Sequence, residues 1–178
     1  MNIPNTLSLF RLFLVPVYLV VFFSKLRHAH LIAAVIFVVA GITDIVDGYI
    51  ARKYNQITKL GRILDPLADK FMVWSALISL SVVKIVPRIV TILYFIKEVL
   101  MGIGGLLVWR RTKDMPPSHP LGKASTLLFF ISITVSILFD LPRTVVYLLF
   151  GTALLLMVVT VLFYIRRGVN ILKETKSK

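Results

Sequence analysis

Long apolar stretches separated by short polar segments make up most of the sequence, and several approach the length that a bilayer requires. A helix needs about 20 mainly apolar residues to cross the hydrocarbon core. The pattern therefore predicts an all-α integral membrane protein with six transmembrane helices and a short N-terminal interfacial helix. The predicted spans are Leu7–Phe23, Leu31–Ile50, Ile63–Val83, Pro87–Trp109, Ala124–Phe139 and Thr144–Ile165.

Composition agrees with this class. The chain has 178 residues, of which 58% are hydrophobic and 16% are charged, whereas soluble domains carry about 25% charged residues. This length predicts one membrane-embedded domain over residues 1–178. The first apolar stretch has no basic segment before it and no small-residue cleavage pattern after it, so we expect a retained helix. The sequence contains no cysteine, which excludes disulfides and thiol chemistry.

The excess of basic residues gives a formal net charge of +13. In a membrane protein such an excess sets the topology and attracts anionic lipids. Nucleic-acid binding is not expected, because the sequence has no solvated basic domain. Most lysines and arginines follow the second and fourth spans or lie in the C-terminal tail. The opposite ends carry fewer, namely Lys25, Arg27, Lys84, Arg88 and Arg143. The positive-inside rule therefore places both termini on the cytoplasmic side of a multi-pass protein in the plasma membrane.

Four of the eight acidic residues lie together in one region: Asp44, Asp47, Asp65 and Asp69. A carboxylate at the centre of a membrane helix costs about 2.5–3.5 kcal/mol. Such carboxylates are usually paired, bound to metal or functional. Within each pair the spacing is three or four residues, so each pair shares one helix face. Carboxylate oxygens are ligands for hard divalent cations, and the lack of a Cys/His cluster disfavours zinc.

Two alternatives to a catalytic metal site remain open at this point. Asp65-Pro66 is typical of a helix N-cap followed by proline, and Asp47-Gly48 is typical of a turn. Capping does not explain four aspartates at helical spacing with glycines between them. The other alternative is a divalent-cation transporter, since intramembrane aspartates also mark ion pathways. The clustering of polar residues at one end, with basic residues around them, favours an anionic substrate instead.

The aspartates belong to a longer pattern. Asp44-x-x-Asp47-Gly48-x-x-Ala51-Arg52 is followed, after eight intervening residues, by Gly61-x-x-x-Asp65-x-x-x-Asp69. This resembles the full signature of the CDP-alcohol phosphotransferases, and the six spans resemble their architecture. The resemblance implies a homodimeric membrane enzyme that displaces CMP from a CDP-linked substrate with an acceptor hydroxyl.

The resemblance also implies roles for individual residues. Two Mg²⁺ or Mn²⁺ ions would be held by Asp44, Asp47, Asp65 and Asp69. Asp69 would in addition take the proton of the acceptor hydroxyl. Gly48 would let the nucleotide approach the backbone, Arg52 would bind the diphosphate, and Thr58 would lie near the nucleotide.

The N-terminal sequence carries a second likeness. Its stretch from Pro4 to Arg11 resembles the Pro-Asn-x-Leu-Thr-x-x-Arg pattern of one branch of that family, the bacterial phosphatidylglycerophosphate synthases. Ser8 replaces the threonine and keeps a hydroxyl. The likeness implies that Asn5, Ser8 and Arg11 lie near the nucleotide of CDP-diacylglycerol, and that glycerol 3-phosphate is the acceptor. For Asn5, capping of an interfacial helix is the alternative.

The acceptor remains open between several alcohols. The stretch Leu64–Lys70 is also similar to eukaryotic-type cardiolipin synthases, which would imply phosphatidylglycerol, and a polyol phosphate is a further alternative. The fourth span has Lys97-Glu98 where many bacterial members have Arg-Glu, and it lacks their following arginine. Candidates for binding an acceptor phosphate are Lys97, Arg110, Arg111, Lys123 and Arg166. For all of these except Lys97, a role in membrane topology alone is the alternative.

Overall fold

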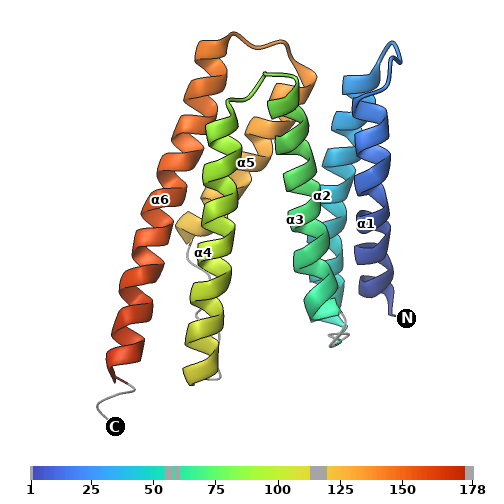
Figure 1. The fold of residues 1–178 in the computed structure, drawn as a ribbon. Helices are drawn as coiled ribbons and strands as arrows, with labels where there is room; N and C mark the ends of the chain where they lie inside the picture. The colour runs from blue at the N-terminus through green and yellow to red at the C-terminus, as the bar shows by residue number, and fades with distance from the viewer. Residues whose placement is uncertain (1, 55–57, 59–60, 113–119, 175–178) are drawn as a thin grey trace. The chain divides into compact units, whose positions relative to one another are not determined.

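The computed structural model describes residues 2–54, 58, 61–112 and 120–174, and this part of the chain contains helices and no strand. The six helices are α1 (Ile3–Phe22), α2 (Ala29–Lys53), α3 (Gly61–Val82), α4 (Arg88–Thr112), α5 (Pro120–Leu138) and α6 (Arg143–Glu174) (Figure 1). The predicted all-α class is confirmed. Over these residues, five helices are long and apolar enough to cross a membrane. The remaining one is α3, which carries charged side chains in its first half.

The N-terminal segment differs from its prediction. Helix α1 starts at Ile3 and continues to Phe22, so the first residues form its opening turn and not a separate interfacial helix. Pro4 lies in that first turn, where the missing N–H of proline removes no helical hydrogen bond. As a result, the polar side chains near the N-terminus belong to the same rigid helix as the apolar residues that follow.

The start of α3 rules out one alternative for Asp65. The helix begins at Gly61, and both Asp65 and Pro66 lie inside it. The Thr58 hydroxyl accepts a hydrogen bond from the Gly61 N–H at 2.9 Å, which is a capping contact of the kind that stabilises helix starts. The interpretation of Asp65-Pro66 as an N-cap is therefore wrong. Asp65 instead projects from the side of a formed helix, one turn before Asp69.

The chain divides into two compact units. The first comprises Met1–Ile85 and Ile133–Leu141, and the second comprises Val86–Ser132 and Pro142–Lys178. In the first unit α1 packs against both α2 and α3 (Figure 1). All four aspartates of the motif belong to this unit, so α1 is the element that contacts both of the helices that carry them. The single domain over residues 1–178 stays a prediction.

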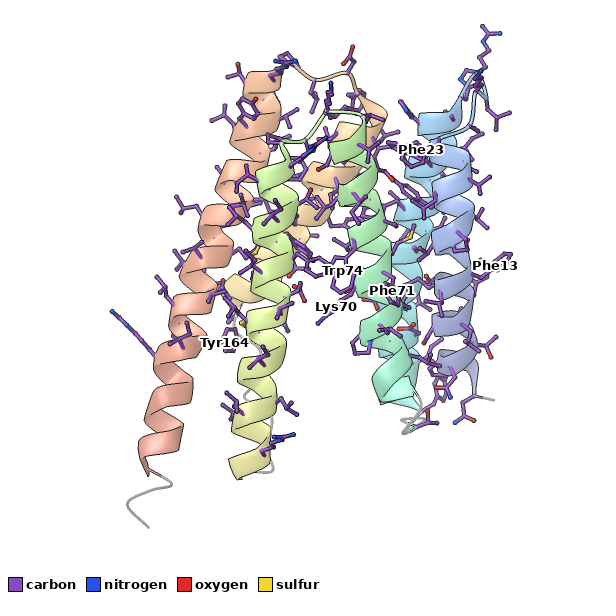
Figure 2. The ribbon with its side chains drawn as sticks, viewed as in Figure 1. Phe13, Phe23, Lys70, Phe71, Trp74 and Tyr164 are labelled. Carbon is purple, nitrogen blue, oxygen red and sulfur yellow. The ribbon has the colours of Figure 1, made fainter. Side chains whose placement is uncertain are left out.

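The core of the first unit is built from aromatic side chains packed against small ones. The Tyr18 ring lies 5.6 Å from Phe22 and 6.4 Å from Phe37, measured between centroids. Three alanines of α2 are also buried, and small side chains of this kind let helices approach closely: Ala33, Ala34 and Ala40. By contrast, Phe13 projects away from the helices and is exposed (Figure 2). An outward apolar side chain of this kind is expected where a helix meets lipid.

The second unit has its own aromatic core. The Phe129 ring lies 4.7 Å from Tyr94 and 5.6 Å from Phe150, so α5 connects α4 and α6 through one side chain. Nearby, α5 approaches α6 closely at Gly122, where a Cβ atom would lie 3.3 Å from Cγ2 of Thr160. These contacts hold the second unit together independently of the aspartates.

Candidate active site

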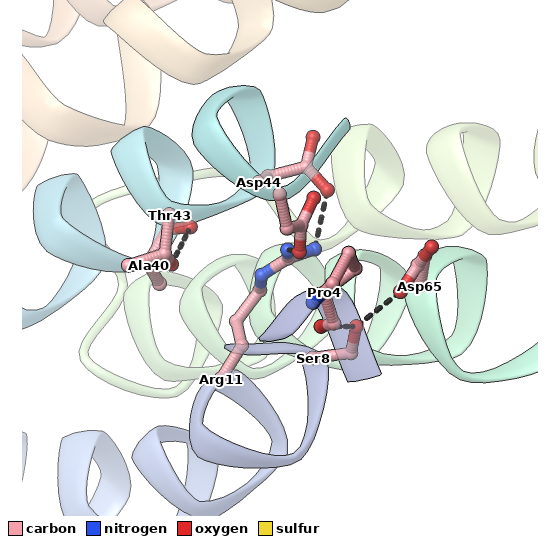
Figure 3. Close-up of polar contacts among 8 residues, drawn as sticks. Pro4, Ser8, Arg11, Ala40, Thr43, Asp44 and Asp65 are labelled. Carbon is pink, nitrogen blue, oxygen red and sulfur yellow. Dashed lines mark hydrogen bonds and ion pairs between the residues drawn. The ribbon is translucent and has the colours of Figure 1, made fainter. Parts of the chain in front are cut away.

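Arg11 joins α1 to α2 through two carboxylates. Its Nη1 donates a hydrogen bond to Oδ1 of Asp44, and its Nη2 donates one to Oδ2 of Asp47 (Figure 3). The side chains of Arg11 and Asp47 are 1% and 2% exposed, whereas that of Asp44 is 41% exposed. Because one planar guanidinium reaches both carboxylates, the two aspartates face the same space, as their three-residue spacing predicted.

Ser8 makes the corresponding contact with α3. Its buried hydroxyl is hydrogen-bonded to Oδ1 of Asp65 and lies 2.9 Å from the Pro4 carbonyl oxygen (Figure 3). A hydroxyl has one proton, so it donates to one of these acceptors at a time. Asp47 is close enough to both Asp44 and Asp65 for their charges to act on it. The first helix therefore brings carboxylates from α2 and α3 into one electrostatic environment.

Asn5 and Thr58 lie at the start of α3. The Thr58 hydroxyl donates a hydrogen bond to Oδ1 of Asn5 at 2.9 Å and accepts one from the Gly61 N–H. Asn5 is buried, and its Oδ1 occupies the space beside Gly61: a Cβ atom added there would lie only 2.6 Å from it. Glycine at this position thus allows α1 and α3 to approach each other. This explains Gly61 of the sequence pattern by packing.

Replacing Gly61 with alanine is expected to lower stability by about 1–3 kcal/mol, which is typical of overpacking. The added methyl group must displace the Asn5 side chain, which is held by Thr58. Thermal unfolding in detergent measures the loss. Gly102→Ala on α4 is the matched control, because nothing lies within 4 Å of a Cβ atom at that position. Equal melting temperatures for the two variants would contradict the close approach.

The remaining predicted residues of the first unit are placed as follows. Asp69 lies one turn after Asp65 on α3 and is partly buried, and Gly48 directly follows Asp47 on α2. The side chain of Arg52 lies outside the part of the chain that the structure describes, although its backbone continues α2. The structure therefore assembles Asn5, Ser8, Arg11, Thr58 and three of the four aspartates by direct contacts or by charge.

The candidate phosphate-binding residues belong to the second unit. The Lys97 ammonium lies 2.5 Å from Oε1 of Glu98 and 5.5 Å from the centroid of the Tyr94 ring. Pairing of neighbours in this way partly neutralises two charges in an apolar helix. Three further candidates are exposed on α4, α5 and α6: Arg110, Lys123 and Arg166. The side chain of Arg111 is outside the described part, and the binding role of all five residues stays a prediction.

The suitability of the site for a metal rests on its donor chemistry. Across the residues that the structure describes, no three acidic or histidine side chains gather closely enough to enclose an ion. Asp44 and Asp47 nevertheless both bind the same cationic group, the Arg11 guanidinium. Paired carboxylates that converge on a cation are suitable ligands for a hard divalent metal. The donors present therefore fit such an ion.

Comparison with known proteins assigns the family. Residues 1–168 match the sequence model of the CDP-alcohol phosphatidyltransferases. The chain belongs to this family. The predicted resemblance is thereby confirmed over residues 1–168, and the protein is a transferase. Members of the family are generally metal-dependent.

Several family members of known name are similar along most of their length. A CDP-diacylglycerol–glycerol-3-phosphate 3-phosphatidyltransferase of Bacillus subtilis (strain 168) is 34% identical over 154 residues, which cover 79% of each chain. The enzyme of that name from Rickettsia bellii is 35% identical over 148 residues, covering 83% of this chain and 81% of its own. A probable phosphatidylglycerophosphate synthase of Mycobacterium tuberculosis (strain H37Rv) is 36% identical over 177 residues, covering 95% and 82%.

The pairing of Arg11 with two aspartates was missed by our sequence interpretation, which placed Arg11 near the nucleotide. A signal for it exists in the sequence. Arg11 is the one basic residue of α1, and a charged group within an apolar helix needs a partner. Asp44 and Asp47 are acidic residues of the next helix, so they were the available partners. What the sequence does not contain is the relative rotation of α1 and α2 that brings them together.

Proposed function

We propose that this protein transfers the phosphatidyl group of CDP-diacylglycerol to glycerol 3-phosphate, giving phosphatidylglycerophosphate and CMP. The observation that carries the proposal is the similarity to enzymes named for this reaction, which extends over about four fifths or more of the chain. Contacts of α1 with three carboxylates of the family pattern support it: those of Asp44, Asp47 and Asp65.

In the proposed reaction the acceptor hydroxyl attacks the phosphorus atom bonded to the lipid, and CMP leaves. Asp69 accepts the hydroxyl proton as the attack proceeds, which is the work of a general base. Arg52 binds the diphosphate through its forked donors, and Gly48 lets the nucleotide pack against the backbone of α2. Asn5, Ser8, Arg11 and Thr58 orient the nucleotide end of the lipid.

We assign two Mg²⁺ or Mn²⁺ ions to the carboxylates of Asp44, Asp47, Asp65 and Asp69. When bound, such ions stabilise negative charge on the attacking and leaving oxygens of a phosphoryl displacement. The chain itself contributes basic residues after α2 and α4, which attract the anionic donor. Lys97, Arg110, Arg111, Lys123 and Arg166 are the candidates for binding the phosphate of the acceptor.

The proposed setting is the plasma membrane of a bacterium, with both termini and the aspartates at the cytoplasmic surface. The basic residues that follow α2 and α4 support this orientation, and CDP-diacylglycerol reaches the site from the bilayer. Anionic lipids would bind around the same basic surface. We further propose a homodimer, as the family resemblance implies.

An acceptor screen tests the proposed substrate. Purified protein in detergent is incubated with CDP-diacylglycerol and Mg²⁺, together with glycerol 3-phosphate, phosphatidylglycerol or a polyol phosphate. The expected result is CMP release with glycerol 3-phosphate that exceeds release with the other acceptors by at least tenfold. Release with phosphatidylglycerol alone would refute glycerol 3-phosphate and would support the cardiolipin synthase alternative.

The cation-transporter alternative is not favoured by the family assignment. The same preparation provides a direct check on it. Reconstituted into vesicles, the protein is expected to release CMP without moving Mn²⁺ across the membrane. Metal flux that needs no nucleotide would contradict the proposed transferase chemistry at these aspartates.

A further inference from the structure

Arg11 is bound to Asp44 and Asp47, the two carboxylates of α2 that the proposed function assigns to a metal ion. We propose that Arg11 competes with the divalent cation for this pair of carboxylates, so that the side chain closes the aspartate pair until metal displaces it. This inference rests on the proposed function, because it takes Asp44 and Asp47 as metal ligands. It adds a regulatory element within α1 that sets how much metal is needed to activate the site.

The contacts of Arg11 favour competition with the metal ion over a role in which Arg11 helps the carboxylates to bind that ion. Each of the two terminal nitrogens of Arg11 donates to a different carboxylate, through Oδ1 of Asp44 and Oδ2 of Asp47. Carboxylate oxygens are also the atoms that would bind a hard divalent cation. A metal ion held by both carboxylates would need the pair of side chains that the guanidinium already engages.

Charge leads to the same conclusion. Arg11 is buried and supplies one positive charge beside the buried carboxylate of Asp47. A divalent cation next to an unmoved guanidinium would experience repulsion that water screens poorly at this depth. Either the arginine moves or the ion binds more weakly, and both outcomes raise the metal concentration required for binding.

The third nitrogen of Arg11, Nε, makes no hydrogen bond in the observed position of the side chain. Nε is buried and has no hydrogen-bond partner, although the two terminal nitrogens are both engaged. An unpaired buried donor is unfavourable. A guanidinium that turns away from the aspartates could satisfy Nε with an anionic oxygen of the nucleotide-linked substrate. The unpaired Nε is therefore consistent with an Arg11 side chain that adopts two positions, one on the aspartates and one on the substrate.

Mn²⁺ binding measured without substrate tests the proposal. The dissociation constant is determined by electron paramagnetic resonance for the wild type, Arg11→Met and Arg11→Lys, all as full-length protein in detergent. Arg11→Met is expected to bind Mn²⁺ at least tenfold more tightly than the wild type. Arg11→Lys should lie between them, because lysine keeps the charge but lacks the fork that reaches both carboxylates. Arg27→Met is the matched control, since Arg27 is exposed beyond the other end of α1, and its dissociation constant should stay within twofold of the wild type.

Thermal unfolding gives a second readout. In EDTA, Arg11→Met should melt at a lower temperature than the wild type, because two carboxylates lose their counter-ion. Saturating Mn²⁺ should remove that difference. Recovery of folded Arg11→Met only in the presence of Mn²⁺ would also support the proposal. If this variant cannot be purified under either condition, Arg11→Lys decides the matter by its dissociation constant.

The outcomes that overturn the proposal are distinct from those that overturn the function. A dissociation constant for Arg11→Met that is unchanged or raised would show that Arg11 does not compete, and a raised value would make it a positioning residue for the ligands. For Arg11→Lys, a Mn²⁺ dissociation constant within twofold of the wild-type constant would overturn the proposal. Absence of Mn²⁺ binding in both the wild type and Arg11→Met would refute the metal assignment itself. Failure of the transferase function is detected separately, as a lack of CMP release by the wild type.

Discussion

Replacing Asp69 with asparagine is expected to reduce CMP release by at least about 100-fold, the lower range of what a general base contributes. The amide has nearly the same size and shape as the carboxylate, so α3 should keep its structure. It cannot accept a proton at neutral pH, however, and it is a weaker ligand for a hard cation. The initial rate of CMP release from CDP-diacylglycerol, measured with saturating glycerol 3-phosphate, checks the expected loss.

Two controls separate the loss of a base from a general effect of the substitution and from weaker metal binding. Asp140→Asn makes the same chemical change at an exposed position between α5 and α6, and its rate should equal that of the wild type. Raising the Mn²⁺ concentration should not restore Asp69→Asn, because weaker metal binding alone would be overcome by excess metal. An Asp69→Asn enzyme with a third or more of the wild-type rate would eliminate Asp69 as the base.

Replacing Asp47 with leucine is expected to destabilise the metal-free protein by about 3 kcal/mol, near the lower end for breaking a buried ion pair. Of the two aspartates that pair with the buried Arg11 side chain, the change leaves Asp44 alone. The Asp44 side chain is 41% exposed, so water screens its charge and it compensates only in part. For a chain of this length, 3 kcal/mol corresponds to a fall in melting temperature of roughly 6–12 °C. Thermal unfolding in EDTA, followed by circular dichroism, measures it.

A double variant shows whether the cost comes from the unpaired charge. Removing both charged groups, as Arg11→Leu with Asp47→Leu, should recover most of the lost stability, since replacing a whole buried pair by apolar groups is often close to neutral. Asp140→Asn again serves as the control and should change stability by less than about 0.5 kcal/mol. Additive losses in the double variant would show that Arg11 and Asp47 do not interact as an ion pair.

Most of the architecture followed from hydrophobic length alone. Each of the six predicted spans is a helix in the structure, and five of these helices are long and apolar enough to cross a membrane. A chain segment surrounded by lipid must satisfy its backbone hydrogen bonds internally, which a helix does. Differences occur at the ends. Helix α1 absorbs the predicted interfacial segment, and α3 starts at Gly61 because Thr58 caps it. Helix ends depend on such individual polar contacts, which apolar periodicity does not record.

The candidate site was predictable as a set of residues but not as a set of contacts. The spacing of Asp44 and Asp47 placed both on one face, and the common contact with Arg11 agrees with this. The roles of these residues, the metal ions and the acceptor site remain predictions. Neither the position of Ser8 beside Asp65 nor that of Asn5 beside Gly61 follows from spacing, because each joins residues more than 50 positions apart.

The sequence by itself determined the class of protein, the helices, the family and which acidic residues make up the candidate site. These depend on composition, local periodicity and the spacing of residues in one pattern. Only the tertiary structure decided which partner each polar side chain takes. The rotation and approach of α1 against α2 and α3 depend on buried alanines, a glycine and aromatic rings acting together. That packing brings the Arg11 guanidinium into contact with both Asp44 and Asp47, so two aspartates of the motif share one buried positive charge.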